Sequence, residues 1–561
     1  MNITFCRWAI AVIILFSFTA CQDGAKDDEV LPPINEFDFV IEPDSLSIPL
    51  GSSYQLRVKL NGVLMKGTDV TWSSNSGVVT IDDSGLITGA YSSDNVSGLY
   101  VEARLSETVF ARCKISVYKE YDYKFRLILK DKGISDFNIT NPGKFLSAKA
   151  IERRKRQGLV VDETDLPVSP AYIKEIEKTG GTVVAQSKWL NTVCVHCSDE
   201  KLADKFSDLP FVSEVVLVWK GVRTPKSFTD NPVKENGNIS SYNIGFLNIP
   251  ENYGEALRNI NVNNGRILHE REFKGKGMDI AVIDGGFYNL NVNPFLKDID
   301  LKGAKSFIYE NPDMYDKDDH GIWVLSCMAA NTPGYYIGTA PEAGYWLLRT
   351  EDPSGEFPVE EDYWAAAAEY ADSAGVDIIN TSLYYTHYNK PYKDYSYEDM
   401  DGKTAFVTRA AEMAAKKGIF VACCAGNDAT WVGAPADASH VLTVGAVTED
   451  GYISSFTSFG KTVDGRIKPD VLALGSNAAV IDTDGTISFK NGTSFATPVL
   501  CGLAACLWQA YPDLTNKELL DILKQSSDKY SDPDLPYGYG ICDMEKAFRL
   551  AGEKTVRNIR R

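Results

Sequence analysis

The rhythm of hydrophobic and polar positions changes twice along the 561-residue chain, and these changes divide it into three folded regions. Between residues 37 and 118, short β-rich runs, such as residues 54–58 and 70–72, are separated by turn residues. This rhythm predicts a small all-β sandwich. Between residues 122 and 220 the pattern is mixed and predicts an α+β domain. Its strand candidates are residues 125–129 and 212–218, and its helix candidates are residues 147–157 and 169–178.

From residue 246 to residue 553, strand and helix patterns alternate. A continuous apolar strand at residues 278–283 ends in Asp284, which is typical of a buried parallel strand whose carboxyl end faces a crevice. The alternation predicts an α/β domain with a doubly wound parallel sheet. Further strands are expected at residues 376–380, 419–424 and 441–447, and helices at residues 363–373 and 404–417.

A small-residue turn at residues 491–498 precedes the apolar run 499–508, which predicts a buried helix. Pro498 favours a helix start close to Ser494, because proline is tolerated in the first turn of a helix. The free amides of that turn and the positive helix end favour a developing negative charge near this serine. A plain N-cap role for Ser494 is the alternative.

A serine nucleophile needs a base and an acid, and the chain offers a candidate for each. His320, one of five histidines, precedes an apolar helix pattern at residues 322–330. Its imidazole would take the serine proton, and the carboxylate of Asp284 would fix the imidazole tautomer. Asn427 follows a strand pattern and can donate hydrogen bonds through its side-chain amide. A structural histidine and a turn-forming asparagine are the alternatives.

These residues lie in motifs that resemble those of the subtilases, the family of subtilisin-like serine peptidases. Residues 492–498 resemble the nucleophile motif of that family, with Phe495 in the place of its usual methionine. Residues 318–321 resemble its histidine motif, and residues 425–427 resemble its oxyanion motif. The acid, the histidine and the serine also follow one another in the family's order. The resemblance extends over residues 253–550.

The resemblance implies roles for eight residues in peptide hydrolysis. Asp284, His320 and Ser494 would form a catalytic triad, and Asn427 would complete the oxyanion hole. The substrate would bind along an edge of the domain as an added strand. The residues implied for this edge are Ser382, Leu383, Tyr384 and Gly426.

Several positions depart from the usual pattern of the family. Gly285 stands in place of serine or threonine, Ile322 in place of threonine, and Leu474 in place of proline. Tyr384 stands where glycine usually follows the Ser-Leu pair. None of these changes removes a reacting group. A phenol ring at position 384 is expected to narrow the pocket for the residue on the acyl side of the cut bond, unless the ring turns to solvent or the following loop shifts the edge.

The resemblance also assigns the two upstream regions. Residues 122–220 resemble the propeptides that precede subtilase domains in Bacteroidetes and act as folding aids and inhibitors. Residues 221–245 are polar and would form a linker that contains the processing region. Residues 37–118 resemble the bacterial immunoglobulin-like group 2 module in the segments 71–75 and 85–89. A spacer role is the default expectation for this module, and a binding role is the alternative.

The N-terminus carries an export signal. Arg7 is followed by an apolar run at residues 8–16, too short to span a bilayer, and then by small residues before Cys21. The Ala-Cys pair resembles a bacterial lipobox, which implies cleavage after residue 20 and a lipid on Cys21. Residues 21–36 would form an acidic tether, and its residues 22–29 are similar to the surface-export signal of Bacteroidetes lipoproteins. We therefore expect an outer-membrane lipoprotein of the cell envelope; a plain cleaved signal is the alternative.

Composition narrows the classes of ligand. The chain has 57 basic and 76 acidic residues and a net charge of −19, which argues against nucleic acid as a partner. Its 11 cysteines show no regular spacing of a disulfide framework. Cys194, His196 and Cys197 suggest a metal site, but they lie in a strand pattern without a second ligand cluster nearby. No cofactor or metal is predicted, and a structural calcium ion is left open.

The sequence thus predicts a secreted serine endopeptidase that acts on polypeptides and is made as a self-inhibited precursor. His320 must be neutral to act as a base. The activity of the peptidase is therefore expected to fall as the pH is lowered, with a midpoint of about pH 6 to 7. The alternative is a cell-surface binding protein with an inactive peptidase-like domain.

Overall fold

The computed structural model describes residues 38–94, 96–223, 252–315 and 318–559. The predicted signal peptide, the tether with Cys21 and most of the predicted linker lie outside the described residues. The chain divides after Glu120 into two units, each with its own hydrophobic core.

The first unit is an all-β fold of three small sheets with the strand orders β1-β4-β5, β2-β10-β9-β6 and β3-β8-β7. The β-rich run at residues 54–58 is divided between two strands. Leu56 turns into the core with 2% of its surface exposed, and the chain passes there from one sheet to another. The elements are β1 Phe39–Glu42, β2 Ser45–Pro49, β3 Ser53–Gln55, β4 Arg57–Leu60, β5 Val63–Leu64, η1 Gly67–Asp69, β6 Thr71–Ser74, β7 Val79–Ile81, β8 Leu86–Gly89, β9 Tyr100–Arg104 and β10 Phe110–Tyr118.

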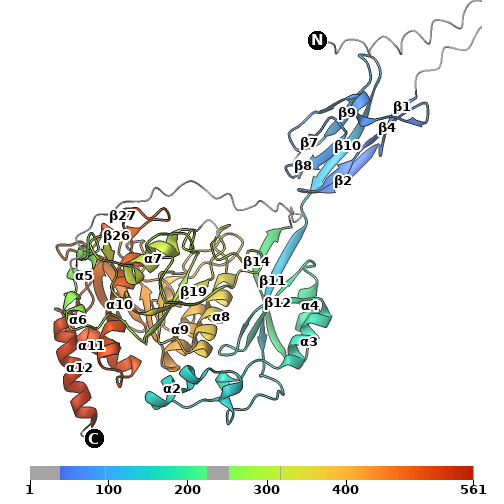
Figure 1. Ribbon diagram of the computed structural model, residues 1–561. Helices are drawn as coiled ribbons and strands as arrows, with labels where there is room; N and C mark the ends of the chain where they lie inside the picture. The colour runs from blue at the N-terminus through green and yellow to red at the C-terminus, as the bar shows by residue number, and fades with distance from the viewer. Residues whose placement is uncertain (1–37, 95, 224–251, 316–317, 560–561) are drawn as a thin grey trace, which may run out of the picture. The chain divides into compact units, whose positions relative to one another are not determined.

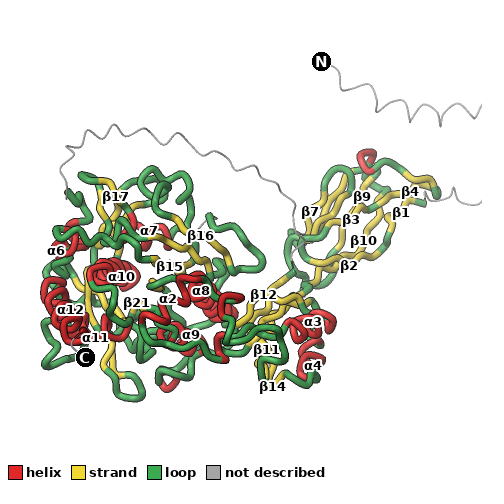
Figure 2. Tube along the Cα trace, turned by 60° about the horizontal axis from the view of Figure 1, so that its bottom comes forward, coloured by secondary structure: helices red, strands yellow, loops and turns green. Residues whose placement is uncertain are grey.

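The second unit begins with a four-stranded antiparallel sheet of order β12-β13-β11-β14. Two helices, residues 170–179 and 202–207, lie on one face of this sheet (Figure 2). Ile176 and Phe206 of these helices pack with Val193 and Val195. The predicted α+β character of this region is confirmed. The elements are β11 Tyr121–Leu129, η2 Pro142–Lys144, α2 Ala148–Arg156, η3 Glu163–Asp165, α3 Pro170–Thr179, β12 Thr182–Ser187, β13 Thr192–Cys197, α4 Leu202–Ser207 and β14 Val212–Val222.

The two cysteines that suggested a metal site lie on opposite faces of this sheet. Because side chains alternate along β13, Cys197 enters the core with α3 and α4, whereas Cys194 points toward α8 (Val359–Ala374). Both thiols are buried. Their sulfur atoms therefore do not converge on one ion.

The larger part of the second unit is built on a seven-stranded sheet of order β16-β19-β15-β20-β21-β22-β25, in which all neighbouring strands are parallel. Alternate residues of β15 enter different cores. Ile280 and Val282 pack with α7 and α10, whereas Ala281 and Ile283 pack with α8 and α9 on the opposite face (Figure 1). The predicted doubly wound parallel sheet is confirmed.

The strands of this part are β15 Asp279–Asp284, β16 Leu301–Ser306, β17 Asn331–Thr332, β18 Tyr336–Ile337, β19 Gly344–Arg349, β20 Ile378–Thr381, β21 Phe420–Cys424, β22 Leu442–Val447, β23 Gly460–Lys461, β24 Ile467–Lys468, β25 Val471–Leu474, β26 Ala478–Ile481 and β27 Ile487–Lys490. The helices are α5 Leu257–Asn261, α6 Arg266–His269, α7 His320–Ala329, α8 Val359–Ala374, η4 Tyr397–Asp399, α9 Phe406–Lys416, α10 Thr493–Ala510, α11 Asn516–Ser526 and α12 Met544–Ile559.

Helix α10 is apolar and long enough to cross a membrane, but 89% of it is buried inside the protein. It is therefore the central core helix of the domain. Because α10 begins at Thr493, Pro498 lies in its second turn. The prediction that this proline occupies the first turn is wrong.

The four-stranded sheet turns its second face to helices α8 and α9. There Arg126 of β11 forms a two-pronged ion pair with Asp362 of α8, with Nε–Oδ1 and Nη2–Oδ2 distances of 2.8 and 2.6 Å. The same guanidinium lies 3.6 Å from the ring centre of Phe406 in α9. Both charged side chains are buried, so this contact is a fixed part of the interface.

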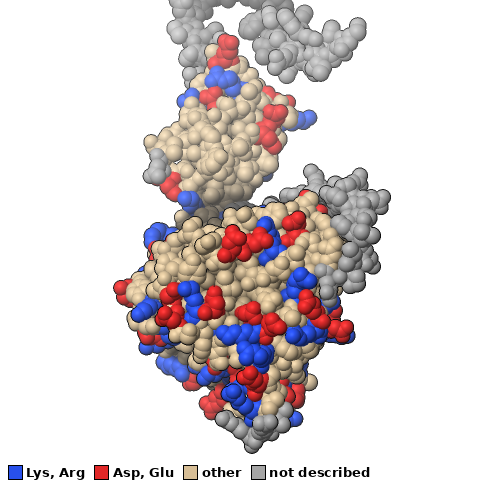
Figure 3. All heavy atoms as spheres, turned by 90° about the vertical axis from the view of Figure 1, so that its left-hand side faces the viewer, with Lys and Arg blue, Asp and Glu red and all other residues tan. Residues whose placement is uncertain are grey.

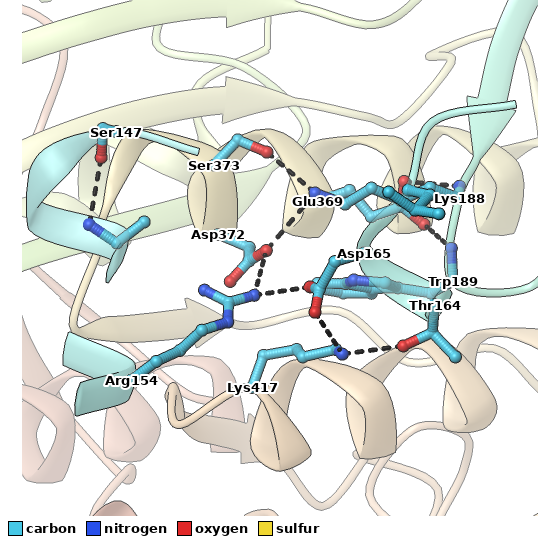
Figure 4. A network of polar contacts seen from close by, with 12 residues as sticks. Ser147, Arg154, Thr164, Asp165, Lys188, Trp189, Glu369, Asp372, Ser373 and Lys417 are labelled. Atoms are coloured by element: carbon cyan, nitrogen blue, oxygen red, sulfur yellow. Dashed lines mark hydrogen bonds and ion pairs between the residues drawn. The ribbon is translucent and has the colours of Figure 1, made fainter. Parts of the chain in front are cut away.

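A second network joins the segment around α2 to the carboxyl-terminal end of α8 (Figure 4). Asp372 accepts from Arg154 at 3.0 Å and also pairs with Arg153 and Lys188. Its neighbour Glu369 accepts from the backbone amides of residues 188 and 189 at 2.8 and 2.9 Å. The positive charges around Asp372 lower its pKa although burial alone would raise it.

Exposed charges of both signs are interspersed on the molecular face in Figure 3. The net charge of −19 is therefore not gathered into one patch on that face. Acidic side chains gather instead in the cavity that holds the candidate site.

Candidate active site

Seven of the eight predicted site residues line one cavity at the carboxyl ends of the parallel strands. Asp284 ends β15, Ser382 follows β20 and Asn427 follows β21. His320 begins α7, and Ser494 lies in the first turn of α10. The cavity has a volume of about 380 Å³. The fold thus brings together residues that are far apart in the sequence.

The carboxylate of Asp284 and the imidazole of His320 form a short hydrogen bond, with 2.7 Å between Oδ1 and Nδ1. Asp284 is fully buried, whereas 30% of the His320 side chain is exposed. Oδ1 also accepts from the backbone amide of Gly285 at 2.8 Å, so the carboxylate is held from two sides. Because Nδ1 faces the carboxylate, Nε2 of His320 is left for proton exchange with another group.

The charges near His320 favour its protonated form. Withdrawal from water lowers its pKa, but the charge and hydrogen bond of Asp284 and the charge of Asp318 outweigh this effect and raise the pKa of His320 to about 9. Asp318 is held close because its Oδ1 accepts from the backbone amide of His320 at 3.0 Å. The midpoint of the fall in activity on the acid side, expected at about pH 6 to 7, therefore shifts to a higher pH.

Ser494 and Ser382 exchange two hydrogen bonds. Ser494 Oγ donates to the carbonyl oxygen of Ser382 at 3.3 Å, and Ser382 Oγ donates to the carbonyl oxygen of Ser494 at 2.8 Å. The second bond replaces one that the helix lacks, because Pro498 has no amide hydrogen for the carbonyl four residues earlier. Within the part of the chain that the structure describes, no hydrogen bond joins Ser494 to His320; such contacts often tighten when substrate binds.

The side-chain amide of Asn427 has a defined orientation. Its Oδ1 accepts from the backbone amide of Thr493 at 2.9 Å and from the hydroxyl of Thr493 at 3.0 Å. A backbone N–H can only donate, so the atom that faces it must be the carbonyl oxygen of the side chain. The NH₂ group of Asn427 is then free to donate toward the cavity that this residue lines.

Comparison with known proteins gives the family. Residues 275–541 match the Peptidase S8 model, described as the subtilase family. Serine protease AprX of Bacillus subtilis (strain 168) is 30% identical over 319 residues, which cover 51% of this chain and 68% of AprX. The chain belongs to the subtilase family.

Two further relatives match at similar levels. Subtilisin NAT of Bacillus subtilis subsp. natto is 27% identical over 379 residues, which cover 66% of this chain and 84% of that protein. Subtilisin Savinase of Lederbergia lenta is 28% identical over 283 residues, which cover 50% of this chain and 94% of that protein. The protein is thus a subtilisin-like serine peptidase, and polypeptides are its class of substrate.

Residues 124–234 match a second model, the Peptidase S8 propeptide domain of Bacteroidota. The four-stranded sheet with α2, α3 and α4 is therefore the propeptide of this subtilase. The peptidase is made as a precursor, as predicted, and its propeptide packs on α8 through buried ion pairs.

Three of the four residues predicted for the substrate edge of the subtilase line the cavity: Ser382, Leu383 and Tyr384. Gly426 does not line it. Gly426 is buried with a φ of +105°, a value that glycine adopts readily, and its amide donates to the hydroxyl of Thr493 at 3.2 Å. It shapes the backbone that carries Asn427.

The ring of Tyr384 crosses from the segment after β20 to the segment after β21. Its hydroxyl donates to Asp428 Oδ1 at 3.4 Å. Its Cδ2 lies so close to Gly433 that a Cβ there would come within 2.9 Å. Burial raises the pKa of the phenol to about 12. The side chain is therefore turned inward between the two segments.

Steric contact explains why glycine occupies position 285, where the acid motif of the family usually has serine or threonine. A Cβ on Gly285 would lie 2.3 Å from Oδ2 of Asp318. Serine or threonine at position 285 would displace this carboxylate, which influences the charge of His320. The glycine at position 285 thus leaves room for the carboxylate of Asp318.

Sequence reasoning missed four carboxylates of the same cavity. They lie in or next to the loop between β19 and α8 and are Glu351, Asp352, Glu356 and Glu360. The available signal was an acidic loop at the carboxyl end of a strand, the edge at which parallel sheets place their sites. Asp318 was seen only as part of the histidine motif.

Proposed function

We propose that this subtilase is a secreted endopeptidase that works through a triad of Asp284, His320 and Ser494. Neutral His320 takes the hydroxyl proton of Ser494 at Nε2 while Oγ attacks the carbonyl carbon of the scissile bond. The buried carboxylate of Asp284 stabilises the imidazolium, which then gives its proton to the leaving amine. Water repeats the sequence on the acyl group and releases Ser494.

The oxyanion formed in each step needs hydrogen-bond donors. The side-chain NH₂ of Asn427 and the backbone amide of Ser494 would supply them, and Thr493 holds Asn427 in the required orientation. In subtilisin, a member of this family, removal of one such side chain lowers turnover by about 100- to 1000-fold.

The observation that carries the proposal is the 2.7 Å contact between buried Asp284 and His320 in the cavity that also holds Ser494. A fluorophosphonate probe tests it, because the probe reacts with an activated serine. The wild-type protein should be labelled, and Ser494→Ala should not. Ser531→Ala, which removes an exposed hydroxyl far along the chain, is the matched control.

The rival proposal is a surface binding protein whose peptidase-like domain is inactive. A folded wild-type protein that stays unlabelled under conditions that label subtilisin would favour this rival. Labelling that persists in Ser494→Ala would show that the reactive nucleophile is a residue other than Ser494.

We also propose that the precursor is exported and that Cys21 carries a lipid that anchors it in the outer membrane. The support is the N-terminal sequence itself, with its short apolar run and the Ala-Cys pair. The first all-β unit, whose sequence resembles an immunoglobulin-like module, would then act as a spacer between the lipid and the peptidase.

A further inference from the structure

The cavity of the proposed triad is acidic. Among the described residues that line it there is no lysine or arginine, and His320 is the one basic side chain. The acidic lining residues are Asp284, Asp318, Glu351, Asp352, Glu356 and Glu360. A positive charge on a ligand in this cavity would stabilise the ionised forms of these side chains, because burial raises the pKa of Glu351, Glu356 and Glu360.

Three of these carboxylates lie close together. One oxygen from each of Glu351, Glu356 and Glu360 lies within 4.8 Å of the other two. Burial and the charge of Glu356 raise the pKa of Glu351 to about 8, although Tyr385 stabilises its charged form by a hydrogen bond. A positive charge placed among them would relieve their repulsion.

The acidic loop, residues 351–360, is held beside the predicted substrate edge, residues 382–384. The hydroxyl of Tyr385, which directly follows that edge, donates to Glu351 Oε1 at 2.7 Å. The amide of Asn389 donates to the backbone carbonyl of Glu356 at 2.9 Å. Buried Glu360 accepts from the amides of residues 352 and 357 at 2.7 and 2.8 Å and so fixes the shape of the loop.

A further acceptor in the same cavity has no partner. Oδ2 of fully buried Asp284 makes no hydrogen bond within the described part of the chain. The cavity therefore combines the proposed nucleophile, an unpartnered buried oxygen and a fixed carboxylate cluster. The occupant of the cavity is a polypeptide, because the protein is a peptidase. The charges that line the cavity then bear on which side chains of that polypeptide are favoured.

We infer that the acidic loop selects polypeptides that carry a lysine or arginine on the acyl side of the cut bond. The inference rests on the proposed function, because it assumes cleavage at Ser494. The flexible stem of lysine or arginine would bring its charge among Glu351, Asp352 and Glu356. The inward ring of Tyr384 leaves little space for a large residue at the cut itself, so the basic residue would lie further upstream.

Peptide pairs that differ only in lysine, alanine or glutamate at the second, third or fourth position before the cut test the inference. With the full-length processed enzyme, kcat/KM for the best lysine peptide should exceed that of its alanine partner by about 5- to 10-fold, and the glutamate peptide should be slowest. The preference should shrink at high salt, because ions screen exposed charges.

The double variant Asp352→Asn/Glu356→Gln removes two charges of the loop but retains hydrogen-bonding groups and leaves the triad untouched. The lysine preference should fall to about 2-fold or less in this variant. Asp513→Asn, which removes an exposed carboxylate outside the cavity, should keep the full preference.

Fluorophosphonate labelling of the same samples separates the two hypotheses. A labelled enzyme that cleaves lysine and alanine peptides equally, or whose preference survives the double substitution, overturns this inference alone. An enzyme that takes no label overturns the proposed function and this inference with it.

Discussion

Asp318 controls the pH range in which His320 can act as a base. Its charge helps to raise the pKa of His320 to about 9, above the ordinary histidine value, so activity should be lost as the pH falls through this raised value. Asp318→Asn removes the charge but keeps an oxygen that can accept from the His320 amide. The acid limb of the kcat/KM profile should move to lower pH, and the rate at pH 7 should rise by about 2- to 5-fold.

Asp450→Asn, which removes an exposed charge in a distant turn, is the control for this profile. An acid limb at the same pH in wild type and Asp318→Asn, with both proteins folded, would show that Asp318 does not act on His320.

Tyr384 should restrict the residue on the acyl side of the cut bond. Its ring lies between two backbone segments and against Gly433, so a large substrate side chain would have to displace it. Excess volume in a packed site costs about 1 to 3 kcal/mol, or roughly 5- to 150-fold in a rate ratio. Tyr384→Gly should therefore raise cleavage after phenylalanine relative to alanine by a factor in this range, as measured with a peptide library.

Tyr452→Gly, in which the lost ring is 68% exposed, should keep the wild-type preference for small residues. The same ratio of alanine to phenylalanine cleavage in wild type and Tyr384→Gly would exclude occlusion by this ring.

At the residue scale, local signals predicted the central site and missed its surroundings. Asp284, His320, Asn427 and Ser494 each stand in a short motif at the end of a strand or the start of a helix, and all four line the cavity. The acidic loop carries no such motif. Its nearness to Ser494 follows from the order of strands in the sheet, which local pattern does not encode.

At the scale of elements, α8 serves two domains at once. It packs on the parallel sheet through Trp364 and offers acidic side chains to the propeptide. Arg126→Ala would leave Asp362 buried without its partner, a loss that typically costs about 3 to 5 kcal/mol. The cleaved propeptide should then separate from the peptidase on gel filtration, whereas the wild-type pair should elute together.

Lys178→Ala is the matched control, because this lysine is 72% exposed and, among the described residues, its ion pair is with Glu175 of its own helix. Retention of the Arg126→Ala propeptide at wild-type strength would mean that the network around Asp372 holds the interface without this pair.

Elements were more predictable than their assembly. Helices α2, α3, α8 and α9 lie within a few residues of the expected ranges, because capping residues and apolar periodicity define them locally. Ser147 and Ser169, for example, accept from amides in the first turns of α2 and α3. The division of residues 54–58 between two sheets and the second-turn position of Pro498 depend on tertiary packing, which local pattern does not specify.

At the scale of the whole molecule, the N-terminal sequence predicts where the protein acts. If a lipid on Cys21 anchors it, Cys21→Ser should move the protein from the membrane fraction to the soluble fraction of the envelope without changing activity per molecule. Cys113→Ser, at a buried thiol of the first unit, controls for general loss of a cysteine. Equal membrane association of Cys21→Ser and wild type would refute the lipid anchor.

The whole precursor should also process itself. The propeptide is fixed to α8 by buried ion pairs, and the residues that connect it to the peptidase lie between Arg223 and Asn252, where the sequence is polar. Because cleavage of this connection by the same molecule needs the Ser494 hydroxyl, Ser494→Ala made in a protease-free system should remain uncut on a denaturing gel, whereas Ser531→Ala should yield the mature size. Added wild-type enzyme should cut the Ser494→Ala precursor if the connection is accessible in the folded state. Mature-sized product from Ser494→Ala alone would exclude self-processing and point to a separate protease.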